Sequence, residues 1–169
     1  MAELLRVASG TPWEPVVGYS RAVKAGTIAC VSGTTATAAD GKLVGIGQMY
    51  IQARQALENI RTALQRMGLA MRDVVRTRIF VTDITRWNDV ARAHREFFGE
   101  HPPACTMVEV RRLISTDMLV EIEADAWVGE GRASKSEPKP AAKSTARAVP
   151  AKHKAAPARK PALRSRPRK

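Results

Sequence analysis

The sequence predicts an α+β fold in which a mixed sheet carries two helices on one face. Two observations predict this class. Apolar and polar residues alternate with a period of two in the segments 74–82 and 118–127, as in strands, whereas apolar residues recur every three or four positions between 48 and 67, as in a helix. The order that we expect is two strands, a helix, a strand, a helix and two strands.

The first two strands form a hairpin. Residues 27–33 are mostly apolar and follow Gly26, which predicts a short buried strand with Cys30 in the core. Residues 19–23 supply its partner strand, and a Thr-rich segment with a turn at Asp40-Gly41 comes after it.

The first helix covers 48–67 and is followed by Gly68, a residue type that commonly ends helices. Its apolar stripe is Ala53, Leu57, Ile60, Leu64 and Met67. A second, shorter helix starts after Asp83 or Thr85, either of which can cap it, and ends at Gly99. Its stripe is Val90, His94, Phe97 and Phe98, in which we expect His94 to be a packed or partly exposed helix residue.

Between the helices lies the strand 74–82. The alternation places Val75, Thr77, Ile79 and Val81 on one face and Arg76, Arg78 and Phe80 on the other. Two further strands follow at 105–110 and 118–127.

The last strand has one apolar and one acidic face. Glu121, Glu123 and Asp125 share a face with Leu119 and Trp127. One interpretation pairs these carboxylates with basic neighbours on adjacent strands, for which the candidates are Arg76, Arg78 and Arg111. The other places a subunit interface or a binding site here. Because the helices cover only one face of the sheet, we expect association to cover the other, in a homo-oligomer.

Charge divides the chain into a domain at 1–129 and a tail at 130–169. The tail has 13 Lys and Arg against 2 Asp and Glu, a net +11 of the total +12, and it lacks aromatic residues. We expect it to be disordered and see no second globular domain. No apolar run is long enough to span a membrane, and no signal peptide or zinc-ligand spacing is present, so we expect a cytoplasmic protein without a structural metal.

Two interpretations of the tail remain open. It binds DNA or RNA non-specifically by neutralising phosphates, which would associate the protein with the nucleoid, or it is a solubilising extension. The candidate nucleic-acid-binding residues are Lys152, Lys154, Arg159, Lys160, Arg164, Arg166, Arg168 and Lys169.

Several short motifs occur together in one order. They are Gly18-Tyr19-Ser20-Arg21-Ala22-Val23, Val31-Ser32-Gly33, the run 52–60, Phe80-Val81-Thr82-Asp83, Pro103-Ala104, Val108-Glu109-Val110 and Val120-Glu121-Ile122-Glu123-Ala124. In this combination residues 15–128 resemble the Rid (reactive intermediate deaminase, or YjgF) family.

The resemblance implies a chorismate-mutase-like subunit in a homotrimer, with small-molecule clefts between neighbouring subunits. Members with the full site hydrolyse enamines and imines to a carbonyl compound and ammonia without a cofactor. Carried over by motif, Tyr19 and Ser32 bind the substrate and Glu121 is the catalytic carboxylate that orients water. Ribonuclease activity has been attached to some relatives, but we find no His/Lys acid–base set for it.

One position departs from the family pattern. Cys105 stands where the deaminating branch has the arginine that holds the substrate carboxylate, and a thiol lacks the donors for that task. Cys105 is a buried filler, a contact for an uncharged ligand, or a catalytic nucleophile activated by His101, the nearby histidine. We therefore expect either a deaminase with an altered substrate range, acting on substrates without a carboxylate, or a non-catalytic trimeric scaffold whose tails bind nucleic acid.

Overall fold

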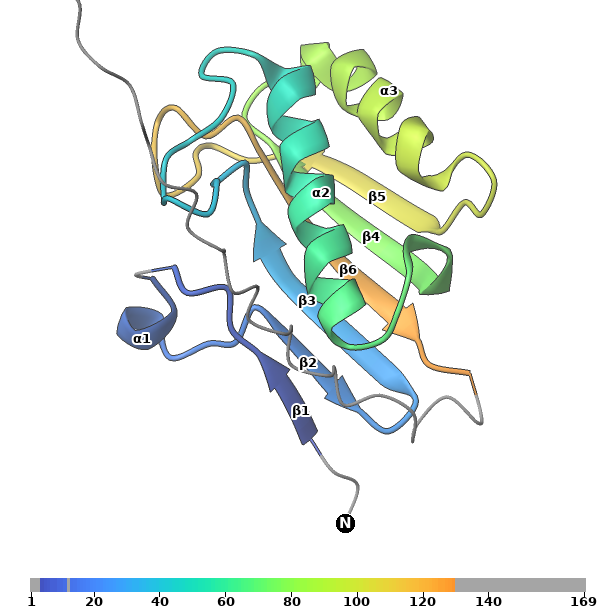
Figure 1. Ribbon diagram of the computed structural model, residues 1–169. Coiled ribbons are helices and arrows are strands. Elements are labelled where there is room, and N and C mark those ends of the chain that lie inside the picture. Colours follow the sequence, from blue (N-terminus) through green and yellow to red (C-terminus); the bar gives the residue numbers. More distant parts are fainter. Residues whose placement is uncertain (1–3, 12, 130–169) are drawn as a thin grey trace, which may run out of the picture. The chain divides into compact units, whose positions relative to one another are not determined.

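The computed structural model describes residues 4–11 and 13–129 (Figure 1). The proposed tail and its basic residues lie outside these ranges. The elements in chain order are β1 (Leu4–Val7), α1 (Trp13–Val17), β2 (Ala22–Ala25), β3 (Ile28–Thr34), α2 (Met49–Arg66), η1 (Met71–Asp73), β4 (Val74–Val81), η2 (Ile84–Arg86), α3 (Trp87–Phe98), β5 (Ala104–Glu109) and β6 (Val120–Trp127).

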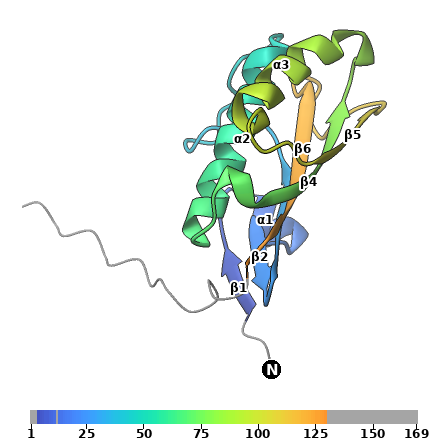
Figure 2. The same cartoon turned by 90° about the vertical axis from the view of Figure 1, so that its right-hand side faces the viewer.

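The strands form one mixed sheet in the order β1-β2-β3-β6-β4-β5. Only β4 and β5 pair in parallel, and the other neighbours are antiparallel. Helices α2 and α3 both lie on one face of the sheet, while none of the helices in the described ranges covers the opposite face (Figures 1 and 2). We call that opposite side the open face. The predicted fold class is confirmed.

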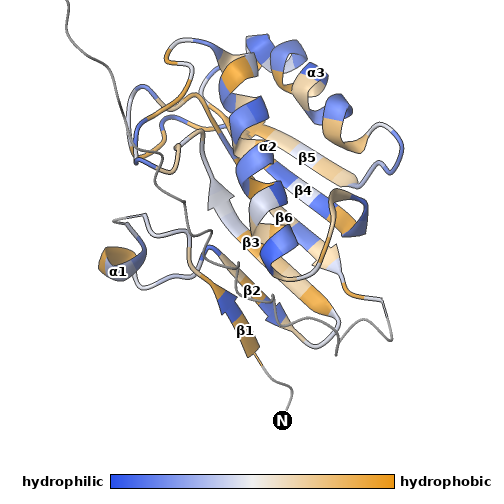
Figure 3. Ribbon diagram, in the orientation of Figure 1, coloured by the Kyte–Doolittle hydropathy of each residue, from blue (hydrophilic) through white to orange (hydrophobic). Residues whose placement is uncertain are grey.

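Helix α2 packs along the middle of the sheet. Its predicted stripe is buried, with Leu57, Ile60 and Leu64 fully inaccessible to solvent. The helix ends because Gly68 takes a positive φ of 74°, which lets Gly68 N–H donate to Gln65 O and Leu69 N–H donate to Leu64 O. The outer sides of α2 and α3 are largely hydrophilic (Figure 3).

Helix α3 follows a short turn that Asp83 caps. The Asp83 carboxylate accepts hydrogen bonds from the backbone N–H of Thr85 at 3.0 Å and from its hydroxyl at 2.5 Å. Val90 and Phe98 are buried against the sheet, and the helix ends before Gly99 as predicted.

The alternation in β4 is interrupted by a bulge. Val74 pairs with Ala126 and Arg76 with Asp125, so β4 uses one more residue than β6 over this step. The extra residue turns Val75 to solvent, and Val74 takes its place in the core. Our assignment of Val75 to the apolar face was wrong, because a bulge resets the register that alternation assumes.

The prediction for Cys30 was also wrong. In β3 only every second residue is buried, and Cys30 is exposed on the open face, opposite Asp125 of β6. Partial desolvation and the negative charge of Asp125 raise the pKa of this thiol.

Two elements were not predicted. Strand β1 extends the hairpin at the edge of the sheet, and α1 lies beside the ends of β1 and β2, away from α2 and α3 (Figure 1). Glu14 of α1 is buried and accepts hydrogen bonds from the backbone N–H and hydroxyl of Ser9 at 2.8 and 2.7 Å, and from Gly10 N–H at 3.2 Å. This contact fixes the loop between β1 and α1.

No helix within the described ranges is long and apolar enough to cross a membrane.

Candidate functional site

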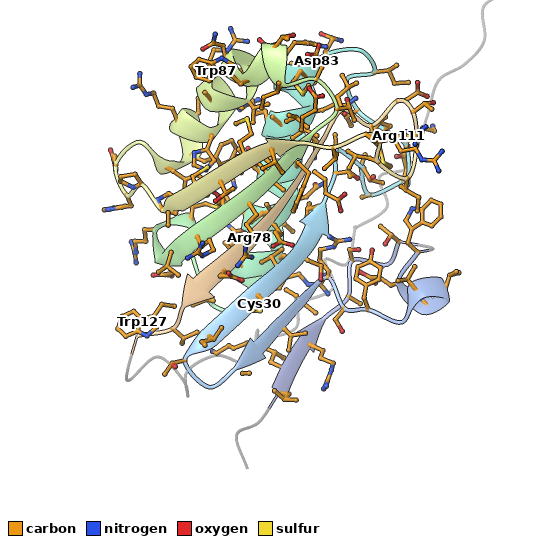
Figure 4. All side chains as sticks on the ribbon, turned by 180° about the vertical axis from the view of Figure 1, so that it is seen from behind. Cys30, Arg78, Asp83, Trp87, Arg111 and Trp127 are labelled. Carbon is orange, nitrogen blue, oxygen red and sulfur yellow. The ribbon has the colours of Figure 1, made fainter. Side chains whose placement is uncertain are left out.

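At the centre of the open face Arg78 of β4 joins two carboxylates of β6 (Figure 4). Its Nη1 lies 2.6 Å from Glu123 Oε1 and its Nη2 lies 3.3 Å from Asp125 Oδ2. The cross-strand interpretation is therefore confirmed for Glu123 and Asp125, with Arg78 as the cation.

Glu121, the third carboxylate of this strand face, lies beside a bulge in β3. Val31 pairs with Ala124 and Thr34 pairs with Ile122. Between these two pairs β3 has two residues, Ser32 and Gly33, whereas β6 has only one. A Cβ atom added to Gly33 would stand 2.1 Å from Glu121 Oε1. The carboxylate therefore occupies space that any side chain at Gly33 would take.

Arg21 holds the bulge from the other side. Its Nη1 donates to the carbonyl oxygens of Ser32 and Gly33 at 3.3 and 2.6 Å and to the Thr34 hydroxyl at 2.8 Å. Its Nη2 donates to the Tyr19 hydroxyl at 2.9 Å. The guanidinium is thereby held in one position by β3 and by Tyr19, which precedes β2.

Tyr19 and Ser32 belong to this cluster. The Ser32 hydroxyl donates to the Ser20 carbonyl at 2.8 Å, and its backbone N–H donates to the Arg21 carbonyl. Ser32 thus ties β3 to the residues before β2, and its hydroxyl oxygen keeps free lone pairs.

Burial raises the pKa of the Glu121 carboxyl. The positive charge of Arg21 lowers it and the negative charge of Glu123 raises it, and the balance is upward. Among residues 4–11 and 13–129 no group donates a hydrogen bond to this carboxylate or lies within ion-pair distance of it.

These groups line a hollow of about 690 Å³ between the Tyr19 segment, the β3 bulge and α2. Tyr19, Arg21, Ser32, Gly33 and Glu121 are all part of its wall. The structure therefore brings together three of the four predicted site residues. We call this space the Glu121 hollow.

Cys105 does not line the Glu121 hollow. It is exposed on β5 opposite Thr77, whose side chain faces the helices, and it lines a separate hollow of about 360 Å³ with Phe98, Met107 and other residues of α3 and β5. The interpretation of Cys105 as a buried filler was wrong, because β5 is an edge strand. We call this space the Cys105 hollow.

The histidine that lines the Cys105 hollow is His94, whereas His101 is not among its lining residues, so the activation of Cys105 by His101 stays a hypothesis. His94 Nε2 lies 3.0 Å from the Thr77 hydroxyl and its ring stacks at 4.5 Å on Phe98. Burial lowers the pKa of His94, which favours the neutral imidazole. His94 is a packed helix residue, as its stripe predicted.

No group of three or more His, Cys, Asp or Glu side chains in the described part of the chain is placed to hold a metal ion. The chemical groups at the Glu121 hollow instead include a carboxylate, two guanidiniums, a phenol, side-chain amides and several hydroxyls. This set can bind a small polar molecule and move protons.

Sequence reasoning missed Arg21. The available signal was its spacing of two residues from Tyr19 in Gly18-Tyr19-Ser20-Arg21, which places both side chains on the same side of an extended segment.

Comparison with known proteins gives a consistent result. The family model described as Endoribonuclease L-PSP matches residues 11–128. Among solved structures, Rv2704 of Mycobacterium tuberculosis, described as a member of the highly conserved YjgF/YER057c/UK114 family, is 46% identical with a TM-score of 0.67, over 75% of this chain and 100% of that one.

Two curated relatives carry names of activities. The chain is 36% identical over 112 residues to the 2-iminobutanoate/2-iminopropanoate deaminase of Salmonella typhimurium, covering 64% of this chain and 85% of that protein. It is 32% identical over 128 residues to the 3-aminoacrylate deaminase RutC of Acinetobacter baylyi, covering 76% of this chain and 100% of that protein. The extent of the match and the shared chorismate-mutase-like fold show that this chain belongs to the Endoribonuclease L-PSP family, the YjgF/RutC group that its motifs resemble.

Proposed function

We propose that the protein hydrolyses small enamines and imines to a carbonyl compound and ammonia, without a cofactor, at the Glu121 hollow. Two relatives named as deaminases of such compounds support the reaction class. The replacement of the family arginine by Cys105 supports a substrate range that differs from theirs.

The observation that carries this proposal is the state of Glu121. A half-buried carboxylate with a raised pKa and no hydrogen-bond donor from the described residues accepts a proton more readily than an ordinary carboxylate does. It lines a hollow large enough for a small substrate and water.

The reaction needs only proton transfers at this group. A water oxygen bonds to the imine carbon while its proton passes to the Glu121 carboxylate, and the resulting carboxyl protonates the nitrogen to give a carbinolamine. A second proton then moves from the carbinol oxygen through Glu121 to the nitrogen, the C–N bond breaks, and ammonia leaves as C=O forms. Atoms and charges balance as one imine and one water give one carbonyl and one ammonia.

Tyr19 and Ser32 complete the site. The Tyr19 hydroxyl already accepts a hydrogen bond from Arg21, so its own O–H is oriented and available to a ligand. The Ser32 hydroxyl has free lone pairs for water.

A homotrimer, with the cleft completed by a neighbouring subunit, belongs to the same proposal. The open face has exposed apolar side chains that assembly would cover, among them Ile28, Val108 and Trp127, at 55, 43 and 54% exposure. Cys105, remote from Glu121 on one chain, would then reach the Glu121 hollow of a neighbour. Light scattering on purified protein tests this, because a monomeric mass contradicts it.

The central test is a coupled assay. An amino acid oxidase generates 2-iminobutanoate, and carbonyl formation is followed with and without the protein. We expect acceleration over the uncatalysed reaction with 2-iminobutanoate or with a neutral imine, and loss of that acceleration in Glu121→Gln. A neutral imine is assayed in parallel to measure substrate range. No acceleration with either substrate would contradict the proposal.

A second proposal concerns the tail, whose net charge of +11 favours non-specific binding of DNA or RNA and association with the nucleoid. Gel-shift titrations compare full-length protein with a 1–129 truncation at several salt concentrations. We expect binding that weakens steeply with salt and disappears on truncation. Unchanged binding by the truncated protein would eliminate this role.

A further inference from the structure

Arg21 is a cation in the Glu121 hollow that forms no ion pair within the described ranges. Two carboxylates are near enough to interact with its charge, Glu14 and Glu121, but neither lies within 4.0 Å of it. Glu14 is already bound by Ser9 and Gly10. The positive charge is therefore held in place without being neutralised by contact.

The hydrogen bonds of Arg21 leave part of the guanidinium unused. A guanidinium has five N–H groups, two on each Nη and one on Nε. Nη1 donates to backbone and hydroxyl oxygens, and Nη2 donates one bond, to Tyr19. The Nε–H and a second N–H of Nη2 have no acceptor among the residues that the structure describes. Two such donors can bind both oxygens of a carboxylate.

The guanidinium is also fixed before any ligand arrives. Four hydrogen bonds to Ser32, Gly33, Thr34 and Tyr19 hold it, and it lies 5.3 Å from the centre of the Tyr19 ring. Binding through a preorganised group loses less side-chain entropy than binding through a mobile one. Arg21 thus differs from exposed arginines such as Arg54, which pairs with Glu96 on the helix surface.

We propose that Arg21 binds the carboxylate of an anionic substrate, so that the protein takes small imino or enamino acids with the acid group at the bulge of β3. The reaction in this proposal rests on the proposed function, whereas the binding of a carboxylate by Arg21 does not depend on it. Arg21 supplies, from its position directly before β2, the cation that position 105 lacks, and it places the carboxylate in the hollow that Glu121 lines. This proposal competes with the expectation of substrates without a carboxylate.

The competing explanation is that Arg21 only stabilises the bulge. A purely structural residue would affect acidic and neutral ligands alike when it is replaced, because its loss would distort the whole hollow. A carboxylate-binding residue would affect the acidic ligand selectively.

The experiment measures binding of 2-oxobutanoate, an acid, and 2-oxobutanamide, its neutral counterpart, to the full chain by titration calorimetry. We expect the acid to bind more tightly, and Arg21→Met to weaken acid binding roughly tenfold or more while amide binding is unchanged. Arg21→Lys should keep part of the preference. Arg54→Met is the matched control and should behave as the unchanged protein.

Several outcomes overturn the proposal. These are undetectable binding of the acid, equal affinity for both ligands, a preference that survives in Arg21→Met, and a preference lost in Arg66→Met instead, since Arg66 is a second arginine in the wall of the hollow. Binding is measured without turnover. Loss of deaminase activity with an intact Arg21-dependent preference would therefore reject only the reaction, and turnover of neutral imines alone would reject only the role of Arg21.

Discussion

The two ends of β6 carry carboxylates that differ in whether a cation contacts them. Glu123 and Asp125 are joined to Arg78 by direct contacts, although both carboxylates are about one-third exposed. Glu121, two residues away on the same face, has a cation nearby that contacts backbone carbonyl oxygens instead of the carboxylate. Burial raises the pKa of Glu121, and the charge of this cation does not offset the effect.

The difference shows which charged groups are neutralised by contacts within the fold and which are not. Arg78 and its partners satisfy each other, so this end of the strand gains structure and offers little to a ligand. At the other end the β3 bulge occupies Nη1 of Arg21 and keeps the guanidinium away from Glu121. A polar group that the fold leaves unsatisfied beside a hollow is a candidate for chemistry.

Replacement of Glu121 gives the largest expected effect. Glu121→Gln should lower kcat/KM roughly a hundredfold or more, because it removes the proton-transferring group. The same change should not lower the free energy of unfolding at neutral pH, since it removes a desolvated charge. Deaminase kinetics and urea denaturation measure the two quantities. The matched control, Glu123→Gln, should retain activity, and equal losses in both variants would refute the contrast.

Substitution of Gly33 should have the next largest effect. In Gly33→Ala the new methyl group meets Glu121 Oε1, so the carboxylate must move away from its position over the bulge. We expect kcat/KM to fall roughly 10- to 100-fold, as for other small displacements of a catalytic group. Gly129→Ala is a control at a position where an added Cβ makes only ordinary contacts, with Trp127. Full activity in Gly33→Ala would show that the position of Glu121 is unimportant.

Arg78 should affect stability more than chemistry. Arg78→Met leaves Glu123 and Asp125 facing each other without a cation and should lower the free energy of unfolding only slightly, since the partly exposed pair is screened by solvent. Chemical denaturation measures this loss, which should diminish at high salt concentration because salt screens the ion pair. A loss that is independent of salt would mean that packing, not charge, is responsible.

The smallest expected effect is a displacement of the pH profile. If the ionised form of Glu121 takes the proton from water, kcat/KM declines as the pH falls through the raised pKa of this group. Arg21→Met removes a charge that lowers this pKa and should move the decline to higher pH, whereas Glu123→Gln removes a charge that raises it and should move the decline to lower pH. Profiles recorded at constant ionic strength measure both, and shifts in the same direction would exclude Glu121 as the titrating group.

The raised pKa of Glu121 also makes the free energy of unfolding depend on pH. The folded-state pKa lies above that of the unfolded chain, so the folded state binds the proton more tightly. The resulting stabilisation is complete below the unfolded value and is lost as the pH rises through the folded value.

The parts of the fold that follow one periodicity could be predicted from the sequence. Helix α2 keeps a single stripe over its whole length, and β6 alternates without interruption, so burial followed directly. The bulges in β3 and β4 could not be predicted, because an extra residue is a property of two paired strands and leaves no periodic mark in one. Strand β1 and helix α1 have only four and five residues, too few for a pattern.

The site was predictable to a similar extent. The motifs located Tyr19, Ser32 and Glu121, which the fold gathers in one hollow. Arg21 was missed because an arginine near a strand is ordinarily a surface residue, and its role depends on carbonyl oxygens that only the β3 bulge presents. Cys105 separates from the others because β5 is the outermost strand on the side opposite β1 and β2.

The two outer strands, β1 and β5, also affect whether the sheet can extend by pairing with strands of other molecules. An unpaired strand edge can recruit further chains into fibres, and a sheet with two such edges can polymerise in both directions. Here each edge is short, Arg6 places a charge on β1, and Pro102 and Pro103, which have no backbone N–H to donate, stand directly before β5. These features discourage end-to-end addition of sheets, so the homotrimer proposed above would form through the open face and not through the strand edges.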